Sequence, residues 1–118
     1  MTGAPRFDDA LVMFTDDGIG SGDDELRTKL LLKYLEILDA NATPPGAIAF
    51  YGRGALLVAE GSPAVEPLRA LERRGARLIV CKTCVDWFGI ADKVAVGVVG
   101  GMGDIAAAQV LAKKVVAP

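Results

Sequence analysis

Short apolar runs alternate along the chain with segments in which apolar residues recur every three or four positions. Five runs are continuously hydrophobic, which is typical of strands that are covered on both faces in a parallel sheet. The predicted strands span residues 10–14, 47–51, 78–81, 94–99 and 115–117.

The segments between these runs have the period of amphipathic helices. Leucines four positions apart predict a long helix over residues 25–39. A second helix is expected to begin at a Ser62 cap and to end at Gly75, and a third to begin near Asp104 and close with residues 113–114, two lysines that complement the helix dipole. Strands alternating with helices predict an α/β fold, a three-layer α/β/α sandwich with a mainly parallel sheet of about five strands.

Composition limits the chain to one soluble domain. It has 118 residues, 52% of them apolar, which is enough for a single core spanning residues 1–118, with residues 1–9 expected to form a flexible tail. The net charge is -2 and there is no basic stripe, so we expect no nucleic-acid partner. We see no signal peptide, and the longest apolar stretch is about half of a membrane span, so we expect a cytoplasmic protein with no membrane partner.

The predicted topology gathers four loops at one edge of the sheet, because all strands of a parallel sheet end on the same side and ligands bind there. These loops are residues 15–24, 52–54, 81–84 and 100–102. The first is glycine-rich but strongly acidic, so we interpret it as a turn that caps the long helix rather than as a phosphate loop.

The strongest candidate chemistry is the pair Cys81 and Cys84. Cys81 ends the third predicted strand, and Cys84 falls in the first turn of the next helix, where the helix dipole and Lys82 favour the thiolate. The alternative is that both are small buried hydrophobic residues. With no histidine and no third cysteine we expect no metal site and no cofactor.

Other residues at this edge are candidates for supporting roles. Arg53, between Gly52 and Gly54, either faces the thiols and stabilises an anionic sulfur or is a solvated loop charge. Thr83 lies between the two cysteines, and Met102 is expected to cap the core beneath them.

Several motifs together resemble one family. They are Gly20-Ser21-Gly22-Asp23-Asp24-Glu25-Leu26, Gly54, Glu60-Gly61-Ser62, the most specific element Cys81-Lys82-Thr83-Cys84-Val85-Asp86-Trp87-Phe88-Gly89, Val96-Gly97 and Met102. From about Leu11 to Val116 the chain resembles the DsrE-like family of sulfur-relay proteins, and within it the carboxyl-terminal domain of YedF-type sulfurtransferase-like proteins. The two-domain relatives carry an amino-terminal sulfur-carrier domain, which we expect this chain to lack.

The resemblance implies a function and its residues. Cys81 takes the place of the family's sulfur-accepting cysteine, and Cys84 that of a second thiol. The implied chemistry is sulfur carriage as a persulfide between donor and acceptor proteins, in a homo-oligomer. The chain departs from the family pattern at Lys82, where the family has glycine, and at Gly52 and Gly101, where it has asparagine.

Three functions therefore remain open. The first is a sulfurtransferase-like persulfide carrier that uses Cys81 with Cys84 assisting. The second is a non-catalytic oligomeric binding module with a pocket for a small ligand at the sheet edge. The third is a dithiol redox protein, although the motif lacks the proline of thioredoxin-type sites.

Overall fold

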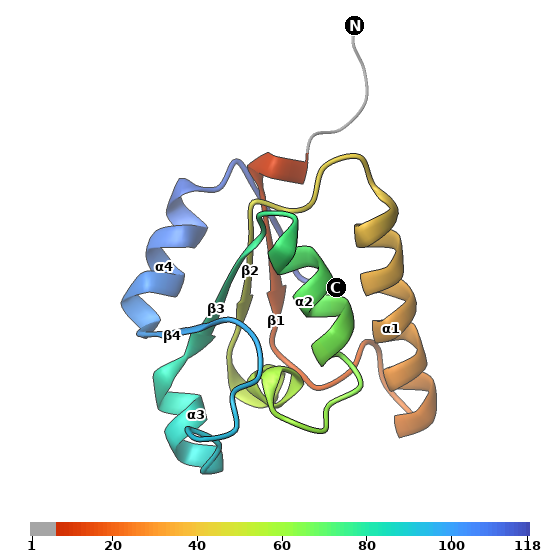
Figure 1. Cartoon of the computed structure of the whole chain (residues 1–118), viewed down its shortest axis with the longest axis vertical. Coiled ribbons are helices and arrows are strands. Elements are labelled where there is room, and N and C mark those ends of the chain that lie inside the picture. The colour runs from red at the N-terminus through yellow and green to blue at the C-terminus, as the bar shows by residue number, and fades with distance from the viewer. Residues whose placement is uncertain (1–6) are drawn as a thin grey trace, which may run out of the picture.

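A parallel five-stranded sheet forms the centre of the computed structural model, which describes residues 7–118 (Figure 1). The strands are β1 (Ala10–Phe14), β2 (Ala47–Phe50), β3 (Arg77–Cys81), β4 (Val98–Gly100) and β5 (Lys114–Val116). They lie in the order β4-β3-β2-β1-β5, and every neighbouring pair is parallel. The predicted sheet is confirmed.

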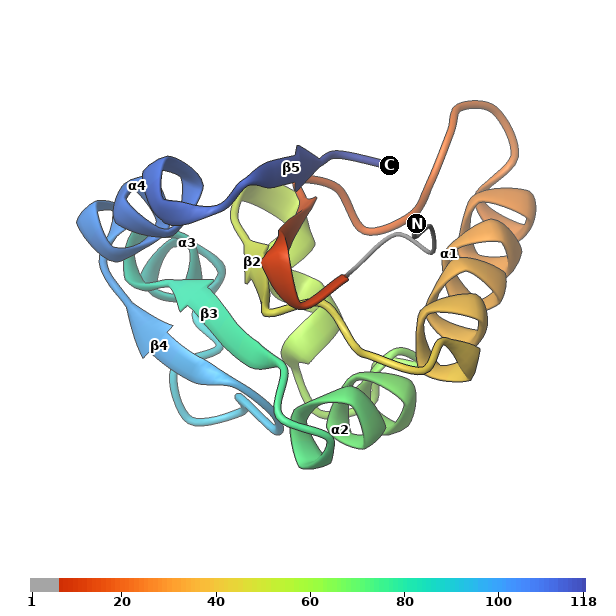
Figure 2. The same cartoon turned by 90° about the horizontal axis from the view of Figure 1, so that it is seen from above.

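Helices cover both faces of the sheet, as the α/β/α prediction requires. The helices are α1 (Asp24–Ala40), α2 (Val65–Arg73), α3 (Lys82–Phe88) and α4 (Met102–Leu111), with short 3₁₀ helices η1 (Phe7–Asp9) and η2 (Gly52–Val58). Seen along the strands, α1 and α2 lie on one face and α4 on the other (Figure 2). The strand order reverses between β4 and β5, and α4, which joins these two strands, is on the face opposite α1 and α2.

Two apolar clusters hold the layers together, because side chains alternate along each strand. Val12 and Phe14 of β1 point towards α1 and α2, where the Phe14 ring stacks on Phe50 at a centroid distance of 5.8 Å. Leu11 and Met13 point the other way and pack in the cluster that contains Ile105 of α4. Both faces are therefore apolar, which explains the continuous hydrophobic runs.

Several expected element ends are wrong. The strand predicted over residues 94–99 is only Val98–Gly100, because Val94 instead forms an isolated antiparallel bridge with Ala59. The last helix ends at Leu111, and Lys114 begins β5, so the two lysines do not close the helix.

The amino-terminal end of α2 also differs from the prediction, since its cap is Ala64 and Ser62 instead accepts a hydrogen bond from the Ala64 N–H. In the expected tail, Phe7–Asp9 form η1, and residues 1–6 lie outside the described part of the chain. Between residues 7 and 118, no helix combines the length and the apolar character needed to cross a bilayer.

Candidate functional site

The two cysteines meet at the carboxyl end of β3, where the sequence predicted them. Cys81 is the last residue of β3, and Cys84 lies in the first turn of α3. Both thiols are free, but their surroundings differ. Cys81 is fully buried (0% exposed) in the cluster that contains Ile105, whereas Cys84 is half-buried and packs against both apolar clusters.

A backbone donor from the neighbouring strand end faces Cys84. The Gly52 N–H donates a hydrogen bond to Cys84 Sγ at 3.0 Å. Gly52 opens η2 two residues after the end of β2 at Phe50, and β2 pairs with β3, so the two strand ends lie side by side. Its φ of +59° is in the left-handed region, which favours glycine, and this conformation fixes the direction of the N–H.

Burial governs the titration of Cys84. Removal from water raises the pKa of the Cys84 thiol, the hydrogen bond from the Gly52 N–H lowers it, and the interaction with Cys81 raises it, so that the net shift is upward. The helix dipole and Lys82, which are visible in the sequence, favour a lowered pKa of the thiol, but burial, which is not, outweighs them.

Lys82 and Thr83, which lie between the cysteines, are on the solvent side of α3. Lys82 Nζ binds the Asp86 carboxylate at 2.7 Å, one turn further along the helix. Thr83 is exposed. The cation that the sequence placed beside the thiols is therefore engaged by Asp86.

Arg53 binds a carboxylate rather than a sulfur. Its guanidinium donates to Asp17 Oδ2 at 2.8 Å, and Arg27 binds both Asp17 and Asp16. The hydrogen bond from Arg53 is the largest cause that lowers the pKa of Asp17. The loop between β1 and α1 is thus joined to the start of η2 by charge. Arg53 is an exposed loop residue, as the second alternative has it, but it is paired with Asp17 rather than free in solvent.

Asp17 was not singled out from the sequence, because nothing in an acidic run marks which carboxylate meets an arginine 36 residues away. In the same loop Asp23 caps α1 by accepting a hydrogen bond from the Glu25 N–H at 3.1 Å, so the predicted cap is confirmed.

The remaining candidates have structural surroundings. Gly54 is buried against the end of β1, where an added Cβ would lie 2.0 Å from the Phe14 carbonyl oxygen. Met102 begins α4 and is 48% exposed, so the prediction that it caps the core is wrong.

Two hollows in the surface have linings that include neither thiol. One hollow, of about 280 Å³, follows β3 and β4, and the charged residues Glu72, Arg77 and Asp104 are part of its lining. Another of about 280 Å³ lies at the amino ends of the strands, between Asp9 and Lys113. Neither is lined by Cys81 or Cys84. In the part of the chain that the structure describes, no three His, Cys, Asp or Glu side chains are grouped to hold a metal ion.

Comparison with known proteins agrees with this fold. Residues 10–118 match the sequence model of the DsrE/DsrF-like family. No curated protein matches the chain with statistical significance.

Three solved structures share the fold over nearly the whole chain. The ychN protein from E. coli is 16% identical with a TM-score of 0.66, covering 91% of this chain and 97% of that one. Protein MTH1491 of unknown function from Methanobacterium thermoautotrophicum is 21% identical with a TM-score of 0.65, covering 92% and 98%. Conserved protein BT1422 of unknown function from Bacteroides thetaiotaomicron is 16% identical with a TM-score of 0.64, covering 98% and 100%.

Proposed function

The chain belongs to the DsrE/DsrF-like family, and from that premise we propose that it carries sulfur as a cysteine persulfide on the Cys81–Cys84 pair. The family has a sulfur-relay-like fold. The observation that carries the proposal is the meeting of two free thiols at the carboxyl edge of the sheet, one of them partly open to solvent and hydrogen-bonded by a backbone N–H. A thiol in this position can attack the terminal sulfur of a donor and later yield it to an acceptor.

The partners in this proposal are a sulfur donor protein and a sulfur acceptor protein, both with reactive cysteines, in the cytoplasm. A reducing compartment keeps Cys81 and Cys84 as free thiols between cycles. We also propose that the chain assembles with copies of itself, since α4 leaves large apolar side chains exposed.

Intact-mass spectrometry tests the proposal. The reduced chain is incubated with thiosulfate, or with a cysteine desulfurase and cysteine, and its mass is compared with that of the Cys81→Ser/Cys84→Ser double variant. We expect a gain of about one sulfur mass (~32 Da) in the wild type, removed by dithiothreitol and absent from the double variant.

The other functions predict different masses. A dithiol redox protein loses about 2 Da on mild oxidation and shows no species about 32 Da heavier with any donor at any time of sampling. A binding module with structural cysteines shows neither change. Its ligand is then to be sought in the hollow that follows β3 and β4. Either result contradicts the persulfide proposal.

A further inference from the structure

The surroundings of the two thiols distinguish their roles. Transfer of sulfur requires the donor's terminal sulfur to approach the attacking sulfur directly. Cys81 is fully buried, whereas Cys84 is partly open to solvent. An incoming donor therefore meets Cys84 first, although the family resemblance assigns the sulfur to Cys81.

The hydrogen bond from Gly52 is directed at Cys84 as well. A thiolate, or the anion of a persulfide, accepts a hydrogen bond more strongly than a neutral thiol does, so a fixed N–H at 3.0 Å favours the charged form. Gly52 N–H is also among the causes that lower the pKa of Cys84, against the opposing effect of burial.

Charged side chains on the neighbouring elements are engaged elsewhere. Three contacts hold them: Lys82 with Asp86, Arg53 with Asp17, and Asp104 with the Gly101 N–H. The groups that act on the Cys84 sulfur are thus the Gly52 N–H and the Cys81 thiol.

We propose that Cys84 is the catalytic thiol that receives sulfur, that the Gly52 N–H is the positioning group for its anion, and that Cys81 is the internal thiol that discharges it. The assignment rests on the proposed function for the identity of the cargo. The roles of Cys84 as nucleophile and of the Gly52 N–H as hydrogen-bond donor are tested without any sulfur cargo.

The proposed reaction is balanced. Cys84–S⁻ attacks the terminal sulfur of a donor persulfide R–S–SH, the new S–S bond forms as the donor's S–S bond breaks, and R–S⁻ leaves. The carried sulfur keeps its proton and its oxidation state. When no acceptor arrives, the Cys81 thiolate attacks Cys84 Sγ and displaces HS⁻. That step oxidises the pair to a disulfide and reduces the carried sulfur to sulfide.

Single variants test the assignment with glutathione persulfide as the donor. We expect the gain of about 32 Da in the wild type and in Cys81→Ser but not in Cys84→Ser. The wild-type adduct should decay to a product about 2 Da lighter than the reduced chain, whereas the Cys81→Ser adduct persists. An adduct that forms in Cys84→Ser and is lost in Cys81→Ser overturns the proposal, as does a wild-type adduct that neither variant forms.

Iodoacetamide alkylation tests the nucleophile without any sulfur donor. In the folded, reduced wild type we expect Cys84 to be alkylated at least tenfold faster than Cys81, as read by peptide mapping. If Cys81 reacts first, the assignment is wrong. If Cys84 reacts first but no donor adds sulfur to the wild type, the assignment stands and the persulfide function fails.

Substitution of Gly52 tests the backbone donor. Gly52→Ala strains the left-handed backbone and brings a Cβ to 3.2 Å from the Thr15 carbonyl oxygen, which displaces the N–H. In the Cys81→Ser background we expect the pH profile of Cys84 alkylation to move upward by roughly half a unit or more, because the thiolate loses its donor.

Gly61→Ala is the matched control. Gly61 has a left-handed φ of +88° and no neighbour within 4 Å, so the variant carries the same kind of backbone strain away from the thiols. Its alkylation profile should equal that of the Cys81→Ser parent. Equal profiles for Gly52→Ala and the parent, or equal shifts in both glycine variants, refute a positioning role for Gly52.

Discussion

At Gly54 the start of η2 passes so close to the end of β1 that no side chain fits. An alanine Cβ there would lie 2.0 Å from the Phe14 carbonyl oxygen and 2.6 Å from its carbon, and both are backbone atoms that cannot rotate away. We expect Gly54→Ala to lower the free energy of unfolding by about 3 kcal/mol, at the upper end of the usual overpacking cost. Urea denaturation followed by circular dichroism measures the change.

Gly103→Ala is the control for this prediction. Gly103 lies in the first turn of α4, where an added Cβ meets no atom within 4 Å. Because alanine favours the helix more than glycine does, this variant should match or exceed the wild type in stability, by up to about 1 kcal/mol. A Gly54→Ala protein as stable as Gly103→Ala would show that the close approach to Phe14 is not maintained in solution.

Cys81, Cys84 and Gly52 show how far single residues can be interpreted from sequence. The sequence predicts that both thiols lie at a strand end and that Gly52 lies at the same edge of the sheet, because a parallel sheet gathers its strand ends at one edge. It did not predict which thiol is buried or that the Gly52 N–H points at Cys84. Burial and hydrogen-bond direction depend on packing between segments about 30 residues apart, and no local pattern records them.

At the scale of elements, Arg74 fastens the end of α1 to the end of α2. Its guanidinium binds the Asp39 carboxylate and donates to the backbone carbonyls of Asp39, Asn41 and Ala42. The last carbonyls of a helix lack hydrogen-bond donors within the helix. A cation that donates to these carbonyls therefore stabilises the end of α1.

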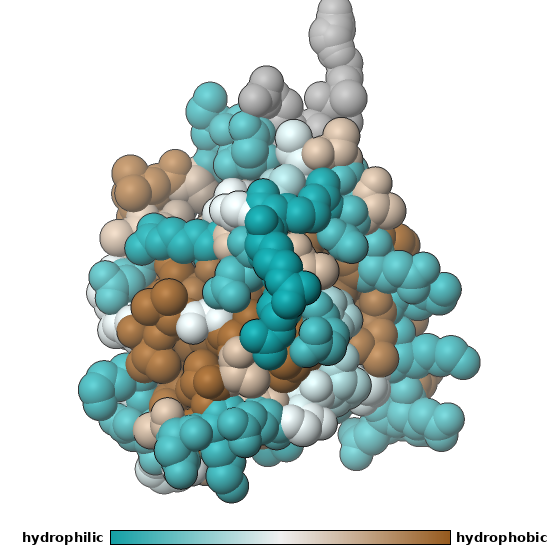
Figure 3. All heavy atoms as spheres, in the orientation of Figure 1, coloured by the Kyte–Doolittle hydropathy of each residue, from teal (hydrophilic) through white to brown (hydrophobic). Residues whose placement is uncertain are grey.

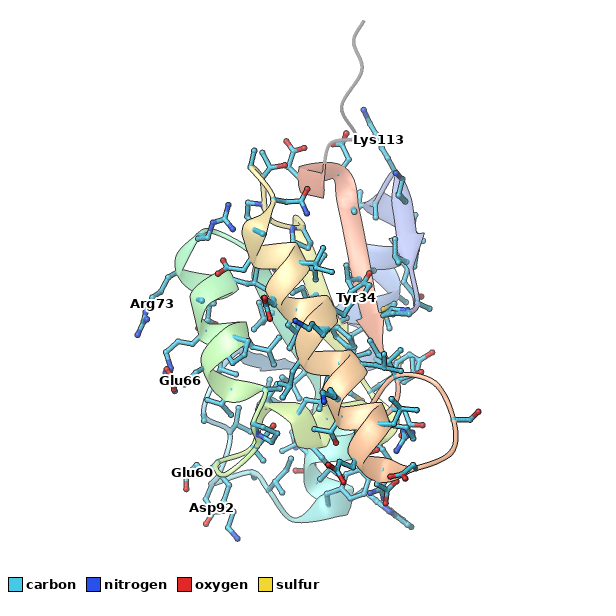
Figure 4. The ribbon with its side chains drawn as sticks, turned by 90° about the vertical axis from the view of Figure 1, so that its right-hand side faces the viewer. Tyr34, Glu60, Glu66, Arg73, Asp92 and Lys113 are labelled. Atoms are coloured by element: carbon cyan, nitrogen blue, oxygen red, sulfur yellow. The ribbon has the colours of Figure 1, made fainter. Side chains whose placement is uncertain are left out.

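We therefore expect Arg74→Ala to destabilise the fold by about 1–2 kcal/mol, since the pair with Asp39 is partly screened by solvent. Arg73→Ala provides the control. Arg73 is the neighbouring residue, is exposed, and projects from α2 into solvent in Figure 4. Equal urea midpoints for the two variants would mean that the Arg74 contacts do not support the end of α1.

The elements that sequence predicted poorly are those without a regular period. Residues 94–97 are as apolar as a strand, yet they run beside η2, where Ala95 N–H donates to the Val58 carbonyl and Gly97 takes a φ of +86°. A hydrophobic run alone does not distinguish a strand from a buried loop. The 3₁₀ helix η2 was missed because residues 52–58 have no amphipathic repeat.

At the scale of the whole molecule, the alternation of strands and helices was enough to predict the sandwich and the edge that carries the thiols. It was not enough to predict the reversal of strand order that leaves α4 on the sheet face opposite α1 and α2. This placement matters because α4 is apolar on its outer side as well. In Figure 3, hydrophobic residues gather over the side of the molecule formed by α4 and β4.

The outer side of α4 predicts self-association. Val110 and Leu111 are 84% and 82% exposed at the end of this helix, and Val98 of the edge strand β4 is exposed too. Adjacent large apolar side chains in water are unfavourable, and a second copy of the chain offers the same apolar surface in return.

Light scattering during size exclusion should give a mass that is a multiple of the 12.3 kDa chain. The Val110→Lys/Leu111→Glu variant should give the monomer with an unchanged circular dichroism spectrum. Leu26→Lys, which changes an exposed leucine on α1, should leave the assembly intact. A wild type that runs at 12.3 kDa contradicts the prediction, and an assembly that survives the double substitution places the interface elsewhere than α4.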